Sequence, residues 1–212
     1  MRLSEKTIEL NFCSQLTRSS GPLVLWFGLT QRQEAQAGFD TCTRVRGRLL
    51  IFQFKASNYT LSSGKRRFYL QHNQLTRLKA RINGYMRSVF YVFPSVGTTL
   101  ELSKNANVPA QCWLLDVARL PTVRPPTTRR GSLRRNGIHY ADVAPGVVTI
   151  HSEPIDVELF PASQYATEGF RGSDGFNRAF RSFEDFWVFC HYIHRTSAAA
   201  VIARPGEQLS TT

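Results

Sequence analysis

The chain has 212 residues, 42% of them hydrophobic and fifteen of them phenylalanine, so it can bury a substantial core and is expected to fold as one domain with additions. Its 27 lysines and arginines exceed its 15 aspartates and glutamates, and the net charge of +12 favours a polyanionic partner such as nucleic acid. A basic protein that binds no polyanion is the alternative. The four cysteines show no Cys-x-x-Cys or Cys-His spacing, which argues against a zinc site and a disulfide framework.

The N-terminal residues 1–6 are polar and lack the apolar core of a signal peptide, and no apolar run is long enough to cross a bilayer. Cysteines without a disulfide framework fit a reducing compartment. We therefore expect a cytoplasmic protein that meets nucleic acid rather than a membrane.

The first predicted element is a helix over residues 5–17, capped by Ser4. Its apolar residues Ile8, Phe12 and Leu16 recur every four positions and mark the buried face. Glu9 lies beside that face, where it could point into a site or remain a solvated carboxylate at the rim.

A buried strand is expected over residues 23–27, followed by a short helix over 31–37 that Thr30 caps and Gly38 ends. Next come two strands, over 39–45 and 49–56, joined by an Arg-Gly-Arg turn that favours a hairpin.

The segment 62–67 is rich in serine, glycine and basic residues and is predicted to be a loop, followed by a helix over 69–82. Strands are expected over 88–93 and 111–117, with a polar connection over 97–110. The order of helices and strands indicates an α/β fold with a mixed sheet.

Residues 119–139 contain three prolines and six arginines without an acid, which predicts an extended loop or flap. It either binds phosphates or is a solvated insertion. Strands over 146–150 and 155–159 follow, and an aromatic helix over 177–195 is expected to pack on the sheet. That helix carries His191 and His194, which we interpret as core or rim residues because a third metal ligand is missing.

The chemistry of the sequence centres on the predicted hairpin. In its second strand Gln53 and Lys55 share one face, while Phe52 and Phe54 face the opposite, helix-covered side. Asp40 begins the first strand, so the hairpin brings a carboxylate, an amide oxygen and an ammonium to one patch. A lysine within a hydrophobic strand is costly to bury without an anion beside it.

These groups suit a metal-dependent phosphodiesterase. Asp40 and Gln53, with a backbone carbonyl and waters, offer the oxygen ligands that Mg²⁺ prefers. Lys55 could orient or deprotonate the attacking water, or stabilise the pentavalent state. The alternative is a plain ion pair between Lys55 and Asp40 on an edge strand.

The sequence Phe-Asp at 39–40, twelve intervening residues, and Phe-Gln-Phe-Lys at 52–55 resemble the PD-(D/E)xK nuclease superfamily, in the Gln-x-Lys variant of Mrr-type restriction enzymes. The core of that family has a helix, three strands, a helix and a strand around a central mixed sheet. This order matches the elements predicted over 4–93, the first half of the chain.

The resemblance implies a restriction-endonuclease-like fold, Mg²⁺ or Mn²⁺ as the cofactor, Asp40 as the central metal ligand, Gln53 as its partner and Lys55 as the catalytic lysine. The sequence departs from the family pattern where a phenylalanine replaces the proline before the acid and Gln53 replaces the second acid. Family members often recover the missing charge with a glutamate from the first helix. Glu9 is our choice for this ligand, and Glu34 on the short helix is the alternative.

Helix residues His72 and Asn73 could contact a phosphate or lie on the surface. The basic loop and flap supply the expected nucleic-acid contacts: Lys65, Arg66, Arg67, Arg124, Arg129, Arg130, Arg134 and Arg135.

The sequence therefore predicts a nuclease-like α/β core over residues 1–118, a basic loop over 119–140, and C-terminal strands and a helix over 141–212 that complete the same domain. The expected function is a Mg²⁺-dependent endonuclease acting on DNA in prokaryotic defence or restriction, with protein partners in a larger complex. The contrasting hypothesis is a non-catalytic nucleic-acid-binding or scaffold subunit with a degenerate site. A third is an RNA-processing nuclease.

Overall fold

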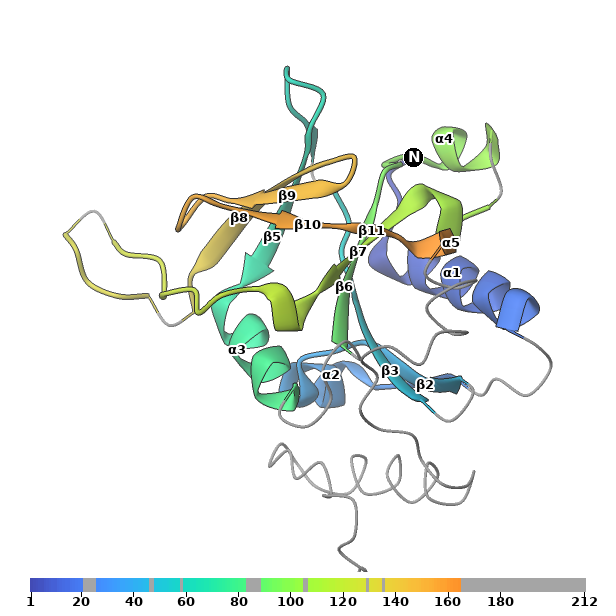
Figure 1. Ribbon diagram of the computed structural model, residues 1–212, viewed down its shortest axis with the longest axis horizontal. Helices are drawn as coiled ribbons and strands as arrows, with labels where there is room; N and C mark the ends of the chain where they lie inside the picture. The colour runs from blue at the N-terminus through green and yellow to red at the C-terminus, as the bar shows by residue number, and fades with distance from the viewer. Residues whose placement is uncertain are drawn as a thin grey trace, which may run out of the picture.

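The fold was examined in a computed structural model of the chain. It describes residues 1–20, 26–45, 48–57, 59–82, 89–104, 107–128, 130–134 and 136–164. Two β-sheets and a small number of helices make up this part of the chain (Figure 1). Among the described helices, none combines the length and the apolar composition that crossing a bilayer requires.

The described helices, including two short 3-10 turns, are α1 (Glu5–Ser20), α2 (Gln31–Ala37), α3 (His72–Arg81), α4 (Thr99–Lys104), η1 (Pro109–Gln111), η2 (Val117–Arg119) and α5 (Ala162–Gln164). The described strands are β1 (Trp26–Gly28), β2 (Thr41–Val45), β3 (Arg48–Phe54), β4 (Tyr59–Thr60), β5 (Arg66–Gln71), β6 (Val89–Pro94), β7 (Cys112–Asp116), β8 (Ile138–Ala144), β9 (Val147–Ile150), β10 (Ile155–Glu158) and β11 (Phe160–Pro161).

The larger sheet has six strands in the order β1-β2-β3-β6-β7-β11. β3 and β6 run parallel, joined by a crossover that contains α3, and the other neighbours are antiparallel. The predicted α/β fold with a mixed sheet is therefore confirmed, as is the hairpin of β2 and β3.

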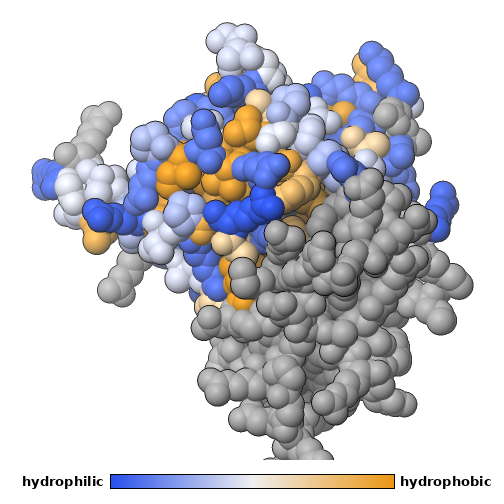
Figure 2. Space-filling model, in the orientation of Figure 1, coloured by the Kyte–Doolittle hydropathy of each residue, from blue (hydrophilic) through white to orange (hydrophobic). Residues whose placement is uncertain are grey.

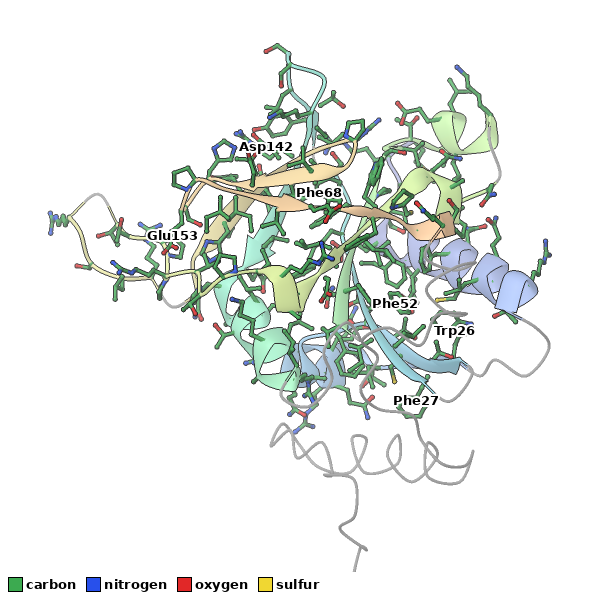
Figure 3. All side chains as sticks on the ribbon, in the orientation of Figure 1. Trp26, Phe27, Phe52, Phe68, Asp142 and Glu153 are labelled. Atoms are coloured by element: carbon green, nitrogen blue, oxygen red, sulfur yellow. The ribbon has the colours of Figure 1, made fainter. Side chains whose placement is uncertain are left out.

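Alternate residues of β3 face opposite sides of this sheet, and each side has its own hydrophobic cluster. Phe52 and Phe54 pack edge-on against Phe12 of α1, which covers one face. Trp26 of β1 also reaches Phe52, and Figure 3 shows these two rings side by side at the edge of the sheet. Ile51 lies in the cluster of the other face, under α3 and the second sheet.

The second sheet has five strands in the order β10-β9-β8-β5-β4 and packs on the larger one. Phe68 of β5, labelled in Figure 3, packs against Phe93 of β6 with tilted rings whose centroids are 4.8 Å apart, so the two sheets share one core. A single domain is consistent with this shared cluster.

Several predictions around this second sheet are wrong. Arg66 and Arg67 are not in a loop, because they begin β5, and Tyr69 belongs to the same strand rather than to the helix. Ile138 and His139 were assigned to the basic loop, yet they begin β8, which pairs with β5 along its whole length. The polar connection over 97–110 contains α4 and η1.

The remaining predicted elements fit more closely. The Thr30 side chain accepts from the Gln33 backbone N–H and the Gln33 side chain accepts from that of Thr30, so a capping box starts α2. Gly38 ends α2 in the left-handed conformation, with φ 82°. The predicted aromatic helix over 177–195, with His191 and His194, lies outside the described residues, as do Arg129 and Arg135.

Candidate functional site

The hairpin of β2 and β3 brings Asp40 beside Gln53. The Asp40 backbone N–H donates to the Phe52 carbonyl over 3.1 Å, and Thr41 pairs with Phe52 in the sheet. Asp40 is therefore the first residue outside β2 and lies opposite Gln53. Both residues are buried: Asp40 is 9% exposed and Gln53 is 1% exposed.

The Asp40 carboxylate is held by donors from β3. Gln53 Nε2 lies 2.8 Å from Oδ1 and 2.8 Å from Oδ2 of Asp40, and the Phe54 backbone N–H donates to Oδ2 over 2.7 Å. Gln53 Nε2 also donates to the Phe54 carbonyl oxygen over 3.1 Å. Two carboxylate oxygens and one carbonyl oxygen thus converge on the position of a single nitrogen.

Burial raises the pKa of Asp40 to about 7, although the Phe54 N–H and the Lys55 ammonium both oppose the change. The nearby charge of Glu5 raises the pKa further, and the Gln53 amide lowers it. At neutral pH the protonated and ionised forms of the Asp40 carboxyl are therefore both populated. Any cation that binds there favours the ionised form.

Lys55 directly follows β3. Its backbone N–H donates to the Val92 carbonyl over 3.1 Å, which extends the pairing with β6, and the residue is 8% exposed. Its ammonium is close enough to lower the pKa of Asp40. The structure thus places Asp40, Gln53 and Lys55 around one point.

The two predicted helical carboxylates, Glu9 and Glu34, lie at the margin of the site formed by Asp40, Gln53 and Lys55. Glu9 is buried, and its carboxylate accepts a hydrogen bond from the Lys6 ammonium over 2.9 Å. This bond raises the pKa of Lys6, and the charges of Glu34 and Asp40 raise it further. Burial raises the pKa of Glu34, and no hydrogen bond links it to the Asp40 site among the described contacts. Lys6 therefore lies between the acidic groups and neutralises part of their charge.

Glu5 has the most direct link to the site among the glutamates, and sequence analysis missed it. Its Oε1 accepts from the Ala56 backbone N–H over 3.2 Å, immediately after Lys55. Glu5 opens the predicted first helix, where a carboxylate is expected simply because it favours the positive end of the helix dipole, so the sequence carried no separate signal of a link to the site.

The donor set fits a cation that takes most of its ligands from water. Within the described ranges, no three histidine, cysteine, aspartate or glutamate side chains gather closely enough to bind a metal between them. However, Gln53 Oε1 is buried and has no hydrogen-bond partner. The Asp40 and Phe54 oxygens instead face Gln53 Nε2, so Gln53 would offer an oxygen to Mg²⁺ or Mn²⁺ beside them only with its amide turned.

Two of the proposed nucleic-acid contacts are engaged within the protein. Arg66 binds Glu101 over 3.1 Å, and Arg67 makes a bidentate pair with Asp142, at 2.6 and 2.7 Å. Asp142 is labelled on the second sheet in Figure 3. The Arg67 guanidinium also lies over the Tyr140 ring, 5.4 Å from its centre. These two arginines therefore stabilise the second sheet.

We expect Arg67→Lys to lower the thermal midpoint of unfolding, because an ammonium cannot replace the bidentate pair or the stacking on Tyr140. Asp142, which is buried, would keep only His151 as a full partner. Differential scanning calorimetry measures the effect, with the exposed Arg32→Lys as the matched control. Equal midpoints for Arg67→Lys and the wild type would contradict this role.

The other basic residues are better placed for an external partner. Arg124, Arg130 and Arg134 are exposed on the extended segment between η2 and β8, and Lys65 lies in the turn before β5. That segment projects from one side of the molecule (Figure 1). Much of its surface is blue or white in Figure 2. Leu133 on the same segment is an apolar exception and is 62% exposed.

His72 and Asn73 do not present free groups at the start of α3. His72 Nδ1 lies 2.9 Å from His139 Nε2, and His139 Nδ1 lies 2.5 Å from Ser152 Oγ. Burial lowers the pKa of His139 to about 4, so its imidazole is neutral at pH 7. Asn73 Oδ1 accepts from the Gln74 backbone N–H. His72 therefore ties α3 to β8, whereas Asn73 bonds to the next residue of α3 itself.

Comparisons of the chain with protein-family models, with curated proteins and with solved structures gave no match.

Proposed function

We propose that the protein is a Mg²⁺-dependent nuclease with a restriction-endonuclease-like core. The observation that carries this proposal is the convergence of both Asp40 oxygens and the Phe54 carbonyl on one point, with Lys55 beside it. The order of elements supports it too, once α2 after the first strand and β4 and β5 of the second sheet are set aside: a helix, three antiparallel strands, a helix, and a strand parallel to the third. This is the order that the resemblance to PD-(D/E)xK nucleases implies.

Each residue has a distinct role in this proposal. Asp40, Gln53 through Oε1, and the Phe54 carbonyl hold the metal, which when bound supplies Lewis acidity toward a phosphate and a water. Lys55 orients the attacking water and stabilises the charge that develops on the phosphate. Burial of the site excludes bulk water and strengthens these interactions.

DNA is the favoured substrate, and the cytoplasm of a prokaryote, in a defence or restriction system, is the proposed setting. The net charge of +12 and the exposed arginines on the projecting segment suit a phosphate backbone. Neither feature distinguishes one base from another, so they supply affinity rather than sequence preference.

The test is cleavage of plasmid DNA and of RNA by the purified protein, with Mg²⁺, with Mn²⁺ and with EDTA. We expect metal-dependent cleavage of DNA that EDTA abolishes. Cleavage of RNA alone would assign an RNA-processing nuclease. No cleavage with either metal, while Asp40→Ala retains biological activity, would refute the nuclease proposal.

A second candidate function is a non-catalytic nucleic-acid-binding or scaffold subunit of a defence complex. The observation that favours it is the low negative charge of the site: Gln53 replaces an acid, Glu9 is paired with Lys6, and burial opposes ionisation of Asp40. In that case the protein binds DNA without cutting it, and Asp40→Ala leaves binding unchanged.

The projecting segment gives a prediction that both candidates share. Replacing Arg124, Arg130 and Arg134 together by glutamine should weaken DNA binding, because each exposed guanidinium releases counterions from the phosphate backbone. If all three contact phosphates, the slope of log K against log salt concentration should become shallower by about 3. Fluorescence anisotropy over a salt series measures it, and Arg32→Gln is the control. An unchanged slope would show that the segment does not contact DNA.

A further inference from the structure

The outer face of the second sheet carries a row of aromatic side chains. Tyr59 of β4 is paired with Arg67 of β5, and Tyr69 of β5 is paired with Tyr140 of β8. Arg67 and Tyr69 alternate with Phe68, which is buried in the core that the two sheets share, so these side chains and their partners lie on the opposite, outer face. We call Tyr59, Arg67, Tyr140 and Tyr69 the tyrosine row.

Contacts between neighbours make the tyrosine row continuous. The Arg67 guanidinium lies 5.9 Å from the centre of the Tyr59 ring and 5.4 Å from the centre of the Tyr140 ring. Tyr140 meets Tyr69 edge-on, with ring centroids 5.3 Å apart. Asp142 accepts two hydrogen bonds from the guanidinium and holds it between the two rings. The rings are thus positioned before any partner binds, which lowers the entropy cost of binding.

The two outer rings of the row are open to solvent. Tyr59 is 43% exposed and Tyr140 is 45% exposed, and Ile138, two residues before Tyr140 on the same face of β8, is 47% exposed. Large apolar side chains that gather on a surface mark a binding site. Tyrosine suits this purpose because it offers a large contact area and loses little conformational freedom on binding.

Basic side chains lie at both ends of the tyrosine row. Because β5 and β8 are antiparallel, the turn with Lys65 lies at one end of the pair, and the projecting segment with the exposed Arg134 enters β8 at the other (Figure 1). Asp142 balances the charge of Arg67, so the middle of the row adds little net charge. The exposed acid Asp156 lies on β10, two strands away from β8.

We infer that the tyrosine row binds single-stranded DNA, with bases stacked on Tyr59 and Tyr140 and with phosphates held by Lys65 and by the arginines of the projecting segment. Arg67 and Tyr69 are positioning residues that fix the two outer rings. The inference rests on the proposed function, from which it takes nucleic acid as the partner, and it names an unpaired strand as the part of the substrate that this face holds.

The chemistry of the row favours an unpaired strand over a duplex. In a duplex each base is stacked between its neighbours, whereas an unpaired base offers its face to an aromatic ring. Stacking does not read the hydrogen-bonding groups of a base, so binding should depend little on sequence. Positive charge at the two ends of the row matches the phosphates on either side of the stacked bases.

The test measures binding of a fluorescein-labelled oligothymidine by fluorescence anisotropy, in EDTA so that metal-dependent cleavage is prevented. Tyr59→Leu and Tyr140→Leu should each weaken binding about 5-fold or more, because leucine keeps apolar bulk but offers no ring. Tyr59→Phe and Tyr140→Phe keep the ring and should bind within about 2-fold of the wild type. Leu100→Ala, which removes an exposed apolar side chain from α4, is the matched control and should bind as the wild type does.

Further oligonucleotides separate stacking from charge. The wild type should bind oligothymidine at least about 10-fold more tightly than an abasic strand of the same length, which keeps every phosphate and lacks the bases. Tyr140→Leu should bind the abasic strand as the wild type does, which also shows that the variant is folded. The slope of log K against log salt concentration should be the same for both proteins, because no charge is removed.

The outcomes separate this inference from the nuclease proposal. Equal binding of oligothymidine by the wild type and both leucine variants, or equal binding of the abasic strand and oligothymidine by the wild type, would overturn the role of the tyrosine row and leave the cleavage assay unaffected. Tighter binding of oligouridine than of oligothymidine would overturn the assignment to DNA. Ring-dependent binding without cleavage in Mg²⁺ or Mn²⁺ would uphold the inference and count against the nuclease.

A protein partner is the remaining occupant of such a face. If the wild type binds no oligonucleotide and instead forms a dimer that Tyr140→Leu dissociates in multi-angle light scattering, the face binds a second copy of the chain and the inference is overturned.

Discussion

Replacing Lys55 by methionine should lower the rate of DNA cleavage at least about 100-fold, while Mn²⁺ binding and folding are retained. Methionine keeps most of the apolar stem that β3 buries but removes the ammonium beside the site. The loss is expected to fall on kcat, since Lys55 acts on the attacking water and the phosphate in the transition state and holds neither the metal nor the DNA in the proposed arrangement.

The control is Lys104→Met, which removes a charge from the exposed end of α4 and should leave the rate unchanged. Single-turnover cleavage of a labelled duplex measures both variants. The same experiment decides between catalysis and a plain ion pair. If Lys55 serves only to pair with Asp40, its loss changes the titration of Asp40 and leaves the cleavage rate as it was.

The central part of the site could be predicted because it depends on local pairing. A tight hairpin fixes which residues of its two strands face each other, so Asp40 and Gln53 had to lie side by side once both strands were assigned. The alternation of side chains along β3 then placed Lys55 on the same face as Gln53. Thr30 and Gly38 fixed the ends of α2 for equally local reasons.

The strands predicted over 146–150 and 155–159 are β9 and β10 of the second sheet, but β5 and the start of β8 were not predicted, because these two strands pair across a long stretch of chain. Arg66 and Arg67 precede the apolar part of β5 and look like loop residues, yet β8, about seventy residues further on, pairs with them. Asp142 on β8 supplies the carboxylate that allows Arg67 to lie in a sheet. Neither the sequence around Arg67 nor the sequence around Asp142 reveals this ion pair when it is read alone.

The choice of glutamate also depended on information that the sequence lacks. Periodicity placed Glu9 near the buried face of α1, and the structure does bury it. Its partner, however, is Lys6, three residues earlier on the same helix. Which carboxylate reaches the site depends on the rotation of α1 against β3, where Glu5 meets Ala56, and this rotation follows from the packing of the aromatic cluster.

Asp40→Asn should make the protein more stable than the wild type at pH 8 but not at pH 4. The pKa of Asp40 is raised by burial from 3.8 to about 7, so the folded state holds this proton more tightly than the unfolded chain does. Burying the Asp40 carboxyl therefore costs no unfolding free energy below about pH 4, and this cost grows as the pH rises toward 7. The full shift corresponds to roughly 4 kcal/mol, an upper limit for the gain in Asp40→Asn.

Urea unfolding between pH 4 and pH 8 measures this difference, and comparison with Asp40→Asn cancels the titration of all other groups. Asp156→Asn, on the exposed part of β10, is the control and should follow the wild type. A difference between the wild type and Asp40→Asn that does not grow with pH would show that Asp40 titrates normally.

Saturating Mg²⁺ extends this experiment to function. A cation that binds the ionised carboxyl lowers its pKa and stabilises the folded state by mass action, so Mg²⁺ should recover stability in the wild type at pH 8 and do little at pH 4. Asp40→Asn should gain nothing from Mg²⁺ at either pH. A metal bound at the proposed site would then offset the cost of ionising the buried Asp40 carboxyl, and without that gain in the wild type at pH 8 the raised pKa of Asp40 would have no link to metal binding.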